Sequence, residues 1–564
     1  MSAQSAIFNP SQTTSAATGD GFSVPRLTTT GRLAIVFGTG DSGMMVYDTT
    51  LNNLFIWNGT AWTSVPDSGD STNTQVIFND NGILAGDAGL IYAKTVQRLT
   101  VHGNIDIWHG ANPVNTSLAI GRDALSLSTT GGANVAIGRR AGNFLTAGSN
   151  SVFVGYQAGF GGGAGTNVAV GASALFANTA GTANVAVGAN ALLAATSGIN
   201  TAVGNSSLSG ATTGDYNTAI GASSGAAITT GAVNIAIGVS ALAGVGTVTG
   251  NYNIGIGSAA MQSASVIAGS DNVGVGRDVL KGLSTGANNV AIGLNAINST
   301  GITSGSDNIS IGRNTARNLT TAADNVIIGR EAGNSLFTGG SNTYVGAGTA
   351  AANLTGATNT GIGFQALNAA IVSDLVAVGA NALLLNTTGL GNTAVGRSAL
   401  AALLTANNCT ALGYNAGRST IGARTTAIGT EAMGLATGGD ANTAVGYNAL
   451  GSGILTTGDN TAVGDSAGQA LSSGGVNTFI GSSSGSTTTT GGSNICIGVN
   501  ARTTAAGSSN EISIGSAAQW VGTTAANTYY PTAVTGTVLP PAGATGFWRV
   551  IINGTARKIA VYAE

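Results

Sequence analysis

The feature that most constrains this chain is a short motif that recurs along most of its length. Residues 134–142 read NVAIGRRAG, and residues 167–175 read NVAVGASAL. Each copy follows the order Asn, aliphatic, small, aliphatic, Gly, and we call the closing residue the anchor glycine. There are 24 anchors from Gly121 to Gly515, so (515 − 121)/23 gives a period of about 17 residues. A fixed period is the signature of a repeat architecture, in which each unit buries its apolar groups against its neighbours.

The motif itself predicts a β-strand. Val135 and Ile137 are two residues apart, so on a strand they share one face while Ala136 lies on the other. Gly and Asn recur too often for a helix. A second short segment, such as ASAL at 172–175, and turns rich in Gly, Thr and Ser complete each copy. The sequence therefore predicts an all-β chain with a long parallel β-solenoid (β-roll) of about 24 coils, each with two short strands and two turns.

A bulky residue recurs four places after the anchor and predicts a narrow filled interior. The residues at this position include Leu125, Leu175, Leu192, Leu242, Leu367, Leu400 and Leu450. Where that position is glycine, a bulky residue often stands three places later, as in Gly142 with Leu145, Gly225 with Ile228, Gly333 with Leu336 and Gly468 with Leu471. Because protein interiors pack to near-crystalline density, two coil types that fill one lumen explain this exchange.

The recurrent asparagine, four places before the anchor, predicts a structural role. Asn favours turns because it tolerates left-handed backbone and hydrogen-bonds to its neighbours. In stacked coils the same residue can also form an amide ladder. Both roles are structural.

The small residues of the motif suggest where chains associate. The aliphatic pair is expected to face inward, so the exterior of the strand is small and another backbone can come close. The resulting trimer-interface candidates are Ala136, Ala169, Ala186, Ala219 and Ala236. Since one coil has a thin core, we expect three chains packed side by side as a homotrimer.

Composition changes at both ends and sets the expected domain boundaries. We expect a flexible or partner-ordered segment at 1–20, a small β attachment module at 21–66 and a second small β module or linker at 67–115. The solenoid shaft is expected at 116–520, and a C-terminal β-hairpin that forms a cap or tip at 521–564.

Charge and hydropathy exclude several classes of function. Only 7% of the 564 residues are charged, and the net charge is −3 without a Lys/Arg cluster, so we expect no nucleic-acid partner. No apolar run reaches 18 residues, so we expect no membrane insertion, and residues 1–12 lack the pattern of a secretory signal. Cys409 and Cys496 lie five coils apart, too far for a disulfide.

No constellation predicts catalysis, a metal or a cofactor. Asp307 and Asp324 occupy the same position in adjacent coils and would lie about 5 Å apart, a spacing compatible with glycoside hydrolysis. Both stand in turn sequences where Asp is common, however, and no aromatic residue lies nearby to stack on a sugar. His102 and His109 match no metal-ligand spacing. We therefore expect a protein that is not an enzyme and has no cofactor.

The motifs resemble two known groups of proteins. Repeats such as NVAIGRRAG and NVAVGANAL resemble the head repeats of trimeric autotransporter adhesins, which implies a parallel β-roll assembled as a trimer. The end sequences GMMVYDTTLNNLFIWNGTAW, NTQVIFNDNGILAGDAGLIY and FWRVIINGTARKIAVYAE are similar to modules of tailed-phage fibres. The resemblance implies a virion tail or head fibre. Its N-terminal end would dock to a baseplate or connector protein, and the fibre would bind a host cell-surface polysaccharide or protein.

Two other functions stay open at this point. One is a surface adhesin of the trimeric autotransporter type, located on the bacterial cell surface, and the other is a polysaccharide-depolymerising tailspike. Aromatic and cationic residues return near the C-terminus, where they either recognise a receptor or cap the last coil. The receptor-binding candidates are Tyr529, Tyr530, Trp548, Arg549 and Arg557.

Overall fold

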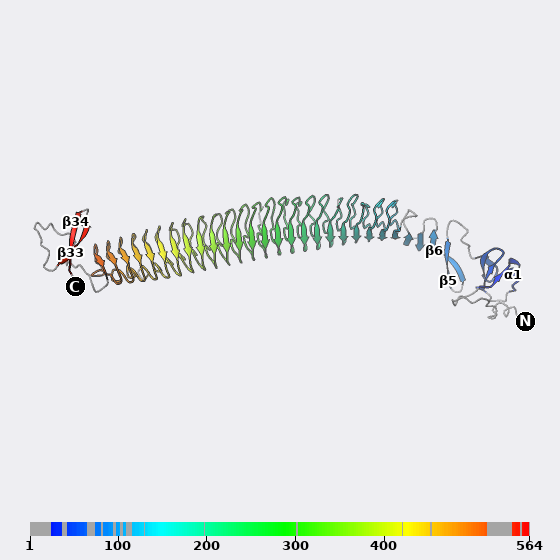
Figure 1. Ribbon diagram of the computed structural model, residues 1–564. Coiled ribbons are helices and arrows are strands. Elements are labelled where there is room, and N and C mark those ends of the chain that lie inside the picture. The colour runs from blue at the N-terminus through cyan, green and yellow to red at the C-terminus, as the bar shows by residue number, and fades with distance from the viewer. Residues whose placement is uncertain are drawn as a thin grey trace, which may run out of the picture. The chain divides into compact units, whose positions relative to one another are not determined.

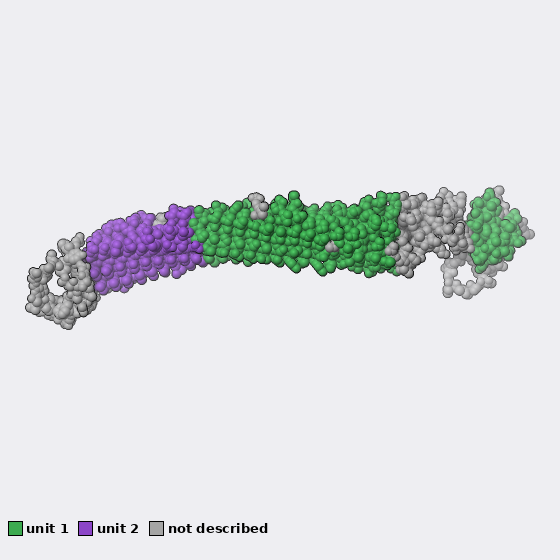
Figure 2. Space-filling model, turned by 90° about the horizontal axis from the view of Figure 1, so that it is seen from above, with its two compact units in different colours: residues 1–373 green, residues 374–564 purple. Residues whose placement is uncertain are grey.

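A computed structural model gives the fold. It describes residues 24–36, 42–64 and 116–515, apart from 129, 197, 300–302, 420, 452 and 453. Strands at 74–80, 83–93, 98–101, 105–108, 544–552 and 555–562 are described by their backbone. The chain divides into two compact units, residues 1–373 and residues 374–564, which Figure 2 colours separately.

The N-terminal module is a four-stranded sheet with one short helix. Its elements are β1 (Arg26–Leu27), α1 (Thr29–Leu33), β2 (Met45–Asp48), β3 (Asn53–Trp57) and β4 (Trp62–Ser64). Strand β1 pairs with β2 in parallel, and β2, β3 and β4 form an antiparallel meander. Its two turns contain Asn52 at φ 51° and Gly59 at φ 96°.

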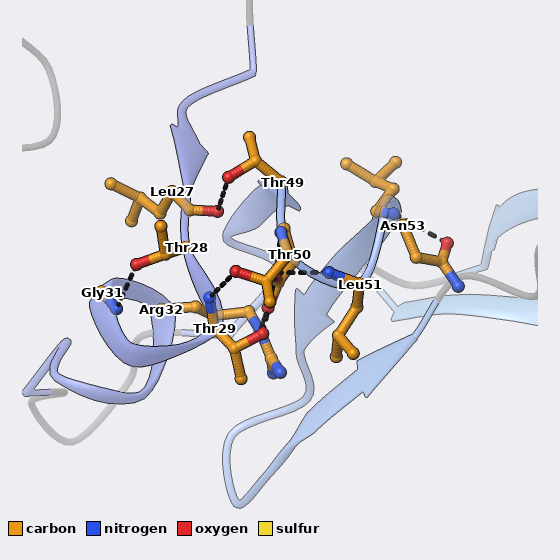
Figure 3. A network of polar contacts seen from close by, with 11 residues as sticks. Leu27, Thr28, Thr29, Gly31, Arg32, Thr49, Thr50, Leu51 and Asn53 are labelled. Atoms are coloured by element: carbon orange, nitrogen blue, oxygen red, sulfur yellow. Dashed lines mark hydrogen bonds and ion pairs between the residues drawn. The ribbon is translucent and has the colours of Figure 1, made fainter.

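A buried ion pair fastens α1 to this sheet. The Asp48 carboxylate accepts hydrogen bonds from Arg32 Nε at 2.9 Å and from Thr29 Oγ1 at 2.9 Å. It also accepts from the backbone N–H groups of Thr50 at 2.9 Å and Leu51 at 3.0 Å. Figure 3 shows these residues converging from the helix and from the turn after β2. Burial alone would raise the pKa of Asp48, but the hydrogen bonds from Leu51, Arg32, Thr29 and Thr50 outweigh it and lower the pKa to about 2.

A second set of antiparallel strands leads into the solenoid. It consists of β5 (Thr74–Asp80), β6 (Ile83–Ala93), β7 (Arg98–Val101) and β8 (Ile105–Trp108). Each strand pairs with the next, and β8 pairs with the first solenoid strand, β9 (Leu118–Ile120). The chain switches from antiparallel to parallel pairing at β9, since β9 and β10 run in the same direction.

The first unit contains 15 solenoid strands, drawn side by side in Figure 1. They are β9, β10 (Val135–Ile137), β11 (Val152–Val154), β12 (Val168–Val170), β13 (Val185–Val187), β14 (Thr201–Val203), β15 (Thr218–Ile220), β16 (Ile235–Ile237), β17 (Ile254–Ile256), β18 (Val273–Val275), β19 (Val290–Ile292), β20 (Ile309–Ile311), β21 (Val326–Ile328), β22 (Thr343–Val345) and β23 (Thr360–Ile362). Each pairs in parallel with the next and without a register shift, as in Val168↔Val185.

The second unit continues the same repeat with nine strands. They are β24 (Val376–Val378), β25 (Thr393–Val395), β26 (Thr410–Leu412), β27 (Thr426–Ile428), β28 (Thr443–Val445), β29 (Thr461–Val463), β30 (Thr478–Ile480), β31 (Ile495–Ile497) and β32 (Ile512–Ile514). A two-stranded antiparallel hairpin, β33 (Ala544–Ile552) and β34 (Thr555–Tyr562), lies nearer the C-terminus. The predicted all-β fold with a parallel solenoid of about 24 coils is confirmed.

Each coil has one strand rather than the two that the sequence predicts. In the coil anchored by Gly171, the segment 172–175 forms consecutive turns instead of a strand. Ser173 and Leu175 both have φ 55°, and left-handed residues cannot continue an extended strand. The segment still bonds to its neighbours, because Ser173 N–H donates to Tyr156 O and Leu175 N–H donates to Ala191 O, both at 2.8 Å.

The predicted lumen filling is confirmed. In coils with a leucine four places after the anchor, that leucine is buried. In coils with a glycine there, the bulky residues that stand three places later are buried, namely Leu145, Ile228, Leu336 and Leu471. The backbone explains the exchange with glycine, since this position is left-handed in both types, as at Leu175 (φ 55°) and Gly142 (φ 57°). Glycine adopts this conformation without strain, whereas leucine accepts some strain and fills the lumen.

The asparagine ladder is also present. The side chain of Asn167 accepts from the Asn184 backbone N–H at 3.0 Å and donates to Gly181 O at 3.0 Å. Elsewhere the amides bond directly, as where Asn289 Nδ2 donates to Asn272 Oδ1 at 3.0 Å. These asparagines are buried, so each amide satisfies backbone groups that would otherwise be left without partners inside the protein.

The anchor glycine has two reasons to be glycine. Gly171 has φ 133°, a conformation that other residues rarely adopt. A Cβ built there would also lie 2.6 Å from the carbonyl carbon of Gly188, the anchor of the next coil. Successive coils therefore touch backbone to backbone at this corner.

Candidate assembly surface

The strand faces are the reverse of the orientation expected from the sequence. Ala136, Ala169, Ala186, Ala219 and Ala236 are each 0% exposed and line the lumen. They cannot contact a second chain there, so the predicted trimer interface is wrong. The physical reason is volume, because the leucine four places after the anchor already fills the lumen and leaves room only for a methyl group beside it.

The aliphatic residues of the motif face outward instead. We call the residues one and three places before each anchor the apolar stripe. Ile137 is 37% exposed, Ile220 is 42% exposed and Ile512 is 58% exposed. Every stripe residue is Val, Ile, Leu or Thr, and none is charged. In each unit the parallel pairing places these residues in two straight columns on one face of the strands. A continuous row of partly exposed apolar residues is the pattern typical of an interaction surface.

One signal in the sequence points to the correct orientation. Threonine replaces the aliphatic residue three places before the anchor in ten coils, among them Thr201, Thr343 and Thr461. A threonine hydroxyl suits a partly exposed β position and would need a hydrogen-bond partner in an apolar lumen.

Polar and charged residues occupy many of the positions that border the stripe on its two sides. We call the residue five places before the anchor the entry rim and the residue one place after it the exit rim. On the exit rim, Arg397 lies over the ring of Tyr414, with the guanidinium carbon 4.5 Å from the ring centroid, and donates to its hydroxyl at 2.7 Å. Arg313 and Arg330 both approach Glu331, at 3.6 Å and 3.7 Å. The exit rim therefore presents cations at the edge of an uncharged face.

The five receptor-binding candidates lie near the C-terminus. Tyr529 and Tyr530 lie outside the described residues. Trp548 and Arg549 are on β33 and Arg557 is on β34, where Trp548 pairs with Ile559, Arg549 with Lys558 and Val550 with Arg557. The hairpin thus brings three of the five predicted residues onto one pair of strands. Their role in binding stays a prediction.

The coils of the first unit also form a shallow groove of about 620 Å³. Its polar lining includes Gln262, Lys281, Asn298 and Arg317, which stand five places after four successive anchors. The groove lies over a stretch that includes the three coils of 19 residues, whose longer turns form extra parallel bridges such as Gly244↔Ser263.

The described residues contain neither a metal-ligand cluster nor a helix that could span a membrane. No group of three or more His, Cys, Asp and Glu side chains in this part of the chain could hold a metal ion. Within the same part, no helix is long and apolar enough to cross a bilayer. His102 and His109 lie outside the described residues. Asp307 and Asp324, the carboxylates weighed for hydrolysis, are exposed beside successive strands.

Comparison with known proteins gives one match. Residues 4–76 match the model of a family described as a phage tail like trimerisation region. No curated protein and no solved structure matches the chain. The match overlaps the N-terminal module and indicates a homotrimer.

Together with the solenoid shaft, this match fits a phage tail fibre-like protein that is part of a virion. The resemblance of the shaft to autotransporter head repeats stays a prediction.

Proposed function

We propose that the protein is the shaft-forming subunit of a homotrimeric phage tail fibre and attaches the particle to a host surface by non-covalent binding. The observation that supports this most is the combination of a trimerisation region at residues 4–76 with an uncharged apolar stripe on the solenoid that follows. The N-terminal end would dock to a baseplate or connector protein. No catalytic step is part of the proposal.

In this proposal the apolar stripe is the surface along which the three chains pack. Burying apolar surface contributes about 25 cal/mol per Å², and the stripe repeats that contribution at every coil. The trimerisation region would hold the chains close, so that packing of the stripes starts from a high effective concentration.

An oligomerisation experiment tests the role of the stripe. Changing Ile237, an outward residue, to Asp should weaken the trimer in sedimentation measurements, because it places a charge in a desolvated interface. The matched control is Thr230→Asp, which places the same charge on an exposed turn of the same solenoid. Equal trimer stability in both variants would refute packing through the stripe.

Recognition is assigned to the C-terminal end. The coils are chemically uniform, whereas specific binding needs a few aromatic or cationic anchors in one place. Trp548, Arg549 and Arg557 provide these residue types on the hairpin of β33 and β34. Exchanging Arg557 or Tyr529 for Ala should reduce host adsorption while trimer melting is unchanged.

The opposite result identifies a cap rather than a receptor site. If adsorption survives while melting falls, the hairpin only closes the end of the trimer. Attachment along the shaft then becomes the alternative, and the groove lined by Lys281 and Arg317 is where an acidic polysaccharide would be sought.

A further inference from the structure

Charges of opposite sign face each other across the apolar stripe in the first unit. Three coils carry an aspartate on the entry rim and an arginine on the exit rim, namely Asp271 with Arg277, Asp307 with Arg313, and Asp324 with Arg330. The coil between the first and second pair has Asn288 and Leu294 at these positions. All six charged residues are exposed. Every acidic residue on the entry rim of the described coils of this unit is thus matched by an arginine of the same coil.

The two charges of one coil cannot neutralise each other. Asp271 and Arg277 are separated by β18 and by a left-handed residue at each end, Asp271 itself at φ 60° and Gly276 at φ 138°. The extended strand holds its two ends apart, and among the described residues no ion pair joins the aspartate and the arginine of any of these three coils. The aspartate and the arginine therefore stand at opposite edges of the stripe.

The entry-rim carboxylates also lack cationic partners nearby. Among the described residues, no ion pair involves Asp271, Asp307 or Asp324. The exit-rim arginines have only loose contacts within the chain, such as Arg277 Nε at 3.8 Å from Asp278. A guanidinium has five N–H donors, so each arginine can accept a further carboxylate.

Three-fold packing through the stripe brings the two rims together. A rotation about an axis parallel to the stack moves each coil to the same height on the next chain. The strands lie across the stack in Figure 1, so both ends of a strand share nearly one height. The entry rim of one chain then borders the exit rim of its neighbour, coil for coil.

We propose that these rims pair between copies of this chain, with Asp271, Asp307 and Asp324 of one copy opposite the three exit-rim arginines of the next, and that the pairs fix the axial register of the trimer. This rests on the proposed trimer. The stripe cannot fix the register, because a slip of one coil, about 4.8 Å, buries the same kinds of residue.

The spacing of the charges distinguishes the correct register from every slip. Along the coils the pattern is charge, none, charge, charge on both rims. In register, all three aspartates meet arginines. A slip of one, two or three coils in either direction leaves only one of the three aspartates opposite one of these arginines and places the other two aspartates against neutral residues. Single polar or charged positions that specify register in this way are well known from coiled coils.

Charge reversal on the full-length chain tests the proposal. The first variant combines Asp271→Arg, Asp307→Arg and Asp324→Arg, and the second combines Arg277→Asp, Arg313→Asp and Arg330→Asp. A third variant carries all six changes. The control combines Arg317→Asp, Arg418→Asp and Arg502→Asp, which reverses three exposed charges away from the rims.

The expected result is restoration by the double reversal. At low salt each single-rim variant should lose trimer at least about tenfold in association constant, while the six-fold variant and the control stay near the unmodified chain. If the single-rim variants behave like the control, or if the six-fold variant is no better than either, the pairing is wrong while the trimer stands. If the unmodified chain is monomeric, the proposed trimer itself fails.

Cross-linking reads the register directly. Asp307→Cys with Arg313→Cys should form a disulfide between chains under mild oxidation, faster than Asp307→Cys with Arg330→Cys, which is one coil out of register. The native Cys409 and Cys496 are buried and should not interfere. Equal rates for the two pairs would overturn the register assignment.

Discussion

Changing Phe153 to Ala should destabilise its coil by about 3–5 kcal/mol, the usual effect of removing a buried phenyl ring. Phe153 stands where most coils have a lumen alanine and is 1% exposed. Its ring lies against two glycines. A Cβ on Gly159 would lie 2.3 Å from its Cδ1, and a Cβ on Gly142 would lie 2.8 Å from its Cδ2. The ring therefore fills the space that a leucine four places after the anchor fills elsewhere.

A second change should reverse most of this loss. The next coil fills the same lumen with Ala169 and Leu175, and Leu175 adopts φ 55° where Gly159 has φ 60°. Phe153→Ala combined with Gly159→Leu recreates that coil type. Left-handed leucine costs about 1–2 kcal/mol, so the double variant should lie within about 2 kcal/mol of the unmodified chain. Gly159→Leu alone should be strongly destabilising, because its side chain overlaps the ring.

Native-state hydrogen exchange of the amides in coils 134–171 measures these free energies locally, which suits a repeat protein that opens in parts. The double-mutant cycle should show a favourable coupling of at least about 2 kcal/mol. Additive losses would refute the view that Phe153 and the residue at 159 compete for one volume. The same coupling should be absent between Phe153→Ala and Thr230→Ala, a change on a distant turn.

Four further predictions concern individual residues. Asp48→Asn should lower the unfolding temperature of the N-terminal module, since it leaves the Arg32 guanidinium without its counter-charge. Thermal unfolding followed by tryptophan fluorescence measures this. In the unmodified chain the pKa of Asp48 is lowered from 3.8 to about 2, so its contribution is complete above pH 4 and is lost as the pH falls toward 2, and acid titration of the same signal should show that loss. Burial raises the pKa of Cys409, and burial together with the nearby Glu511 raises the pKa of Cys496 to about 11. Neither thiol should therefore react with iodoacetamide at neutral pH unless the chain is unfolded. Rapid labelling of the native chain would contradict this. Gly171→Ala should open its corner of the solenoid, because a Cβ there meets the Gly188 backbone at 2.6 Å, and unchanged amide protection in that coil would show that the corner can relax.

The sequence by itself determined the number of coils, their parallel stacking and the recurrent leucine that fills the lumen. A fixed period demands that equivalent residues stack, so a leucine such as Leu175 that recurs once per coil predicts a continuous core without knowledge of the coil shape. The asparagine ladder follows for the same reason, since a buried polar residue that repeats in register always has its own copy as a neighbour.

Only the tertiary structure decided which face of each strand points inward. Alternation in Val135, Ala136 and Ile137 shows that two sets of residues point in opposite directions, but it does not say which set is inside. That choice depends on the volume left by Leu125 and its equivalents, which come from another part of the coil. The left-handed residues after the anchor, such as Ser173, likewise replaced a predicted strand with turns.

The assembly surface is therefore a consequence of packing and not of the motif alone. Once the lumen is full, the aliphatic residues of each strand have no place inside the coil and form the apolar stripe. In the sequence alone, Asp307 and Arg313 are isolated charged residues in turns. Pairing of their rims between chains can be inferred only once the stripe between them is known to face outward.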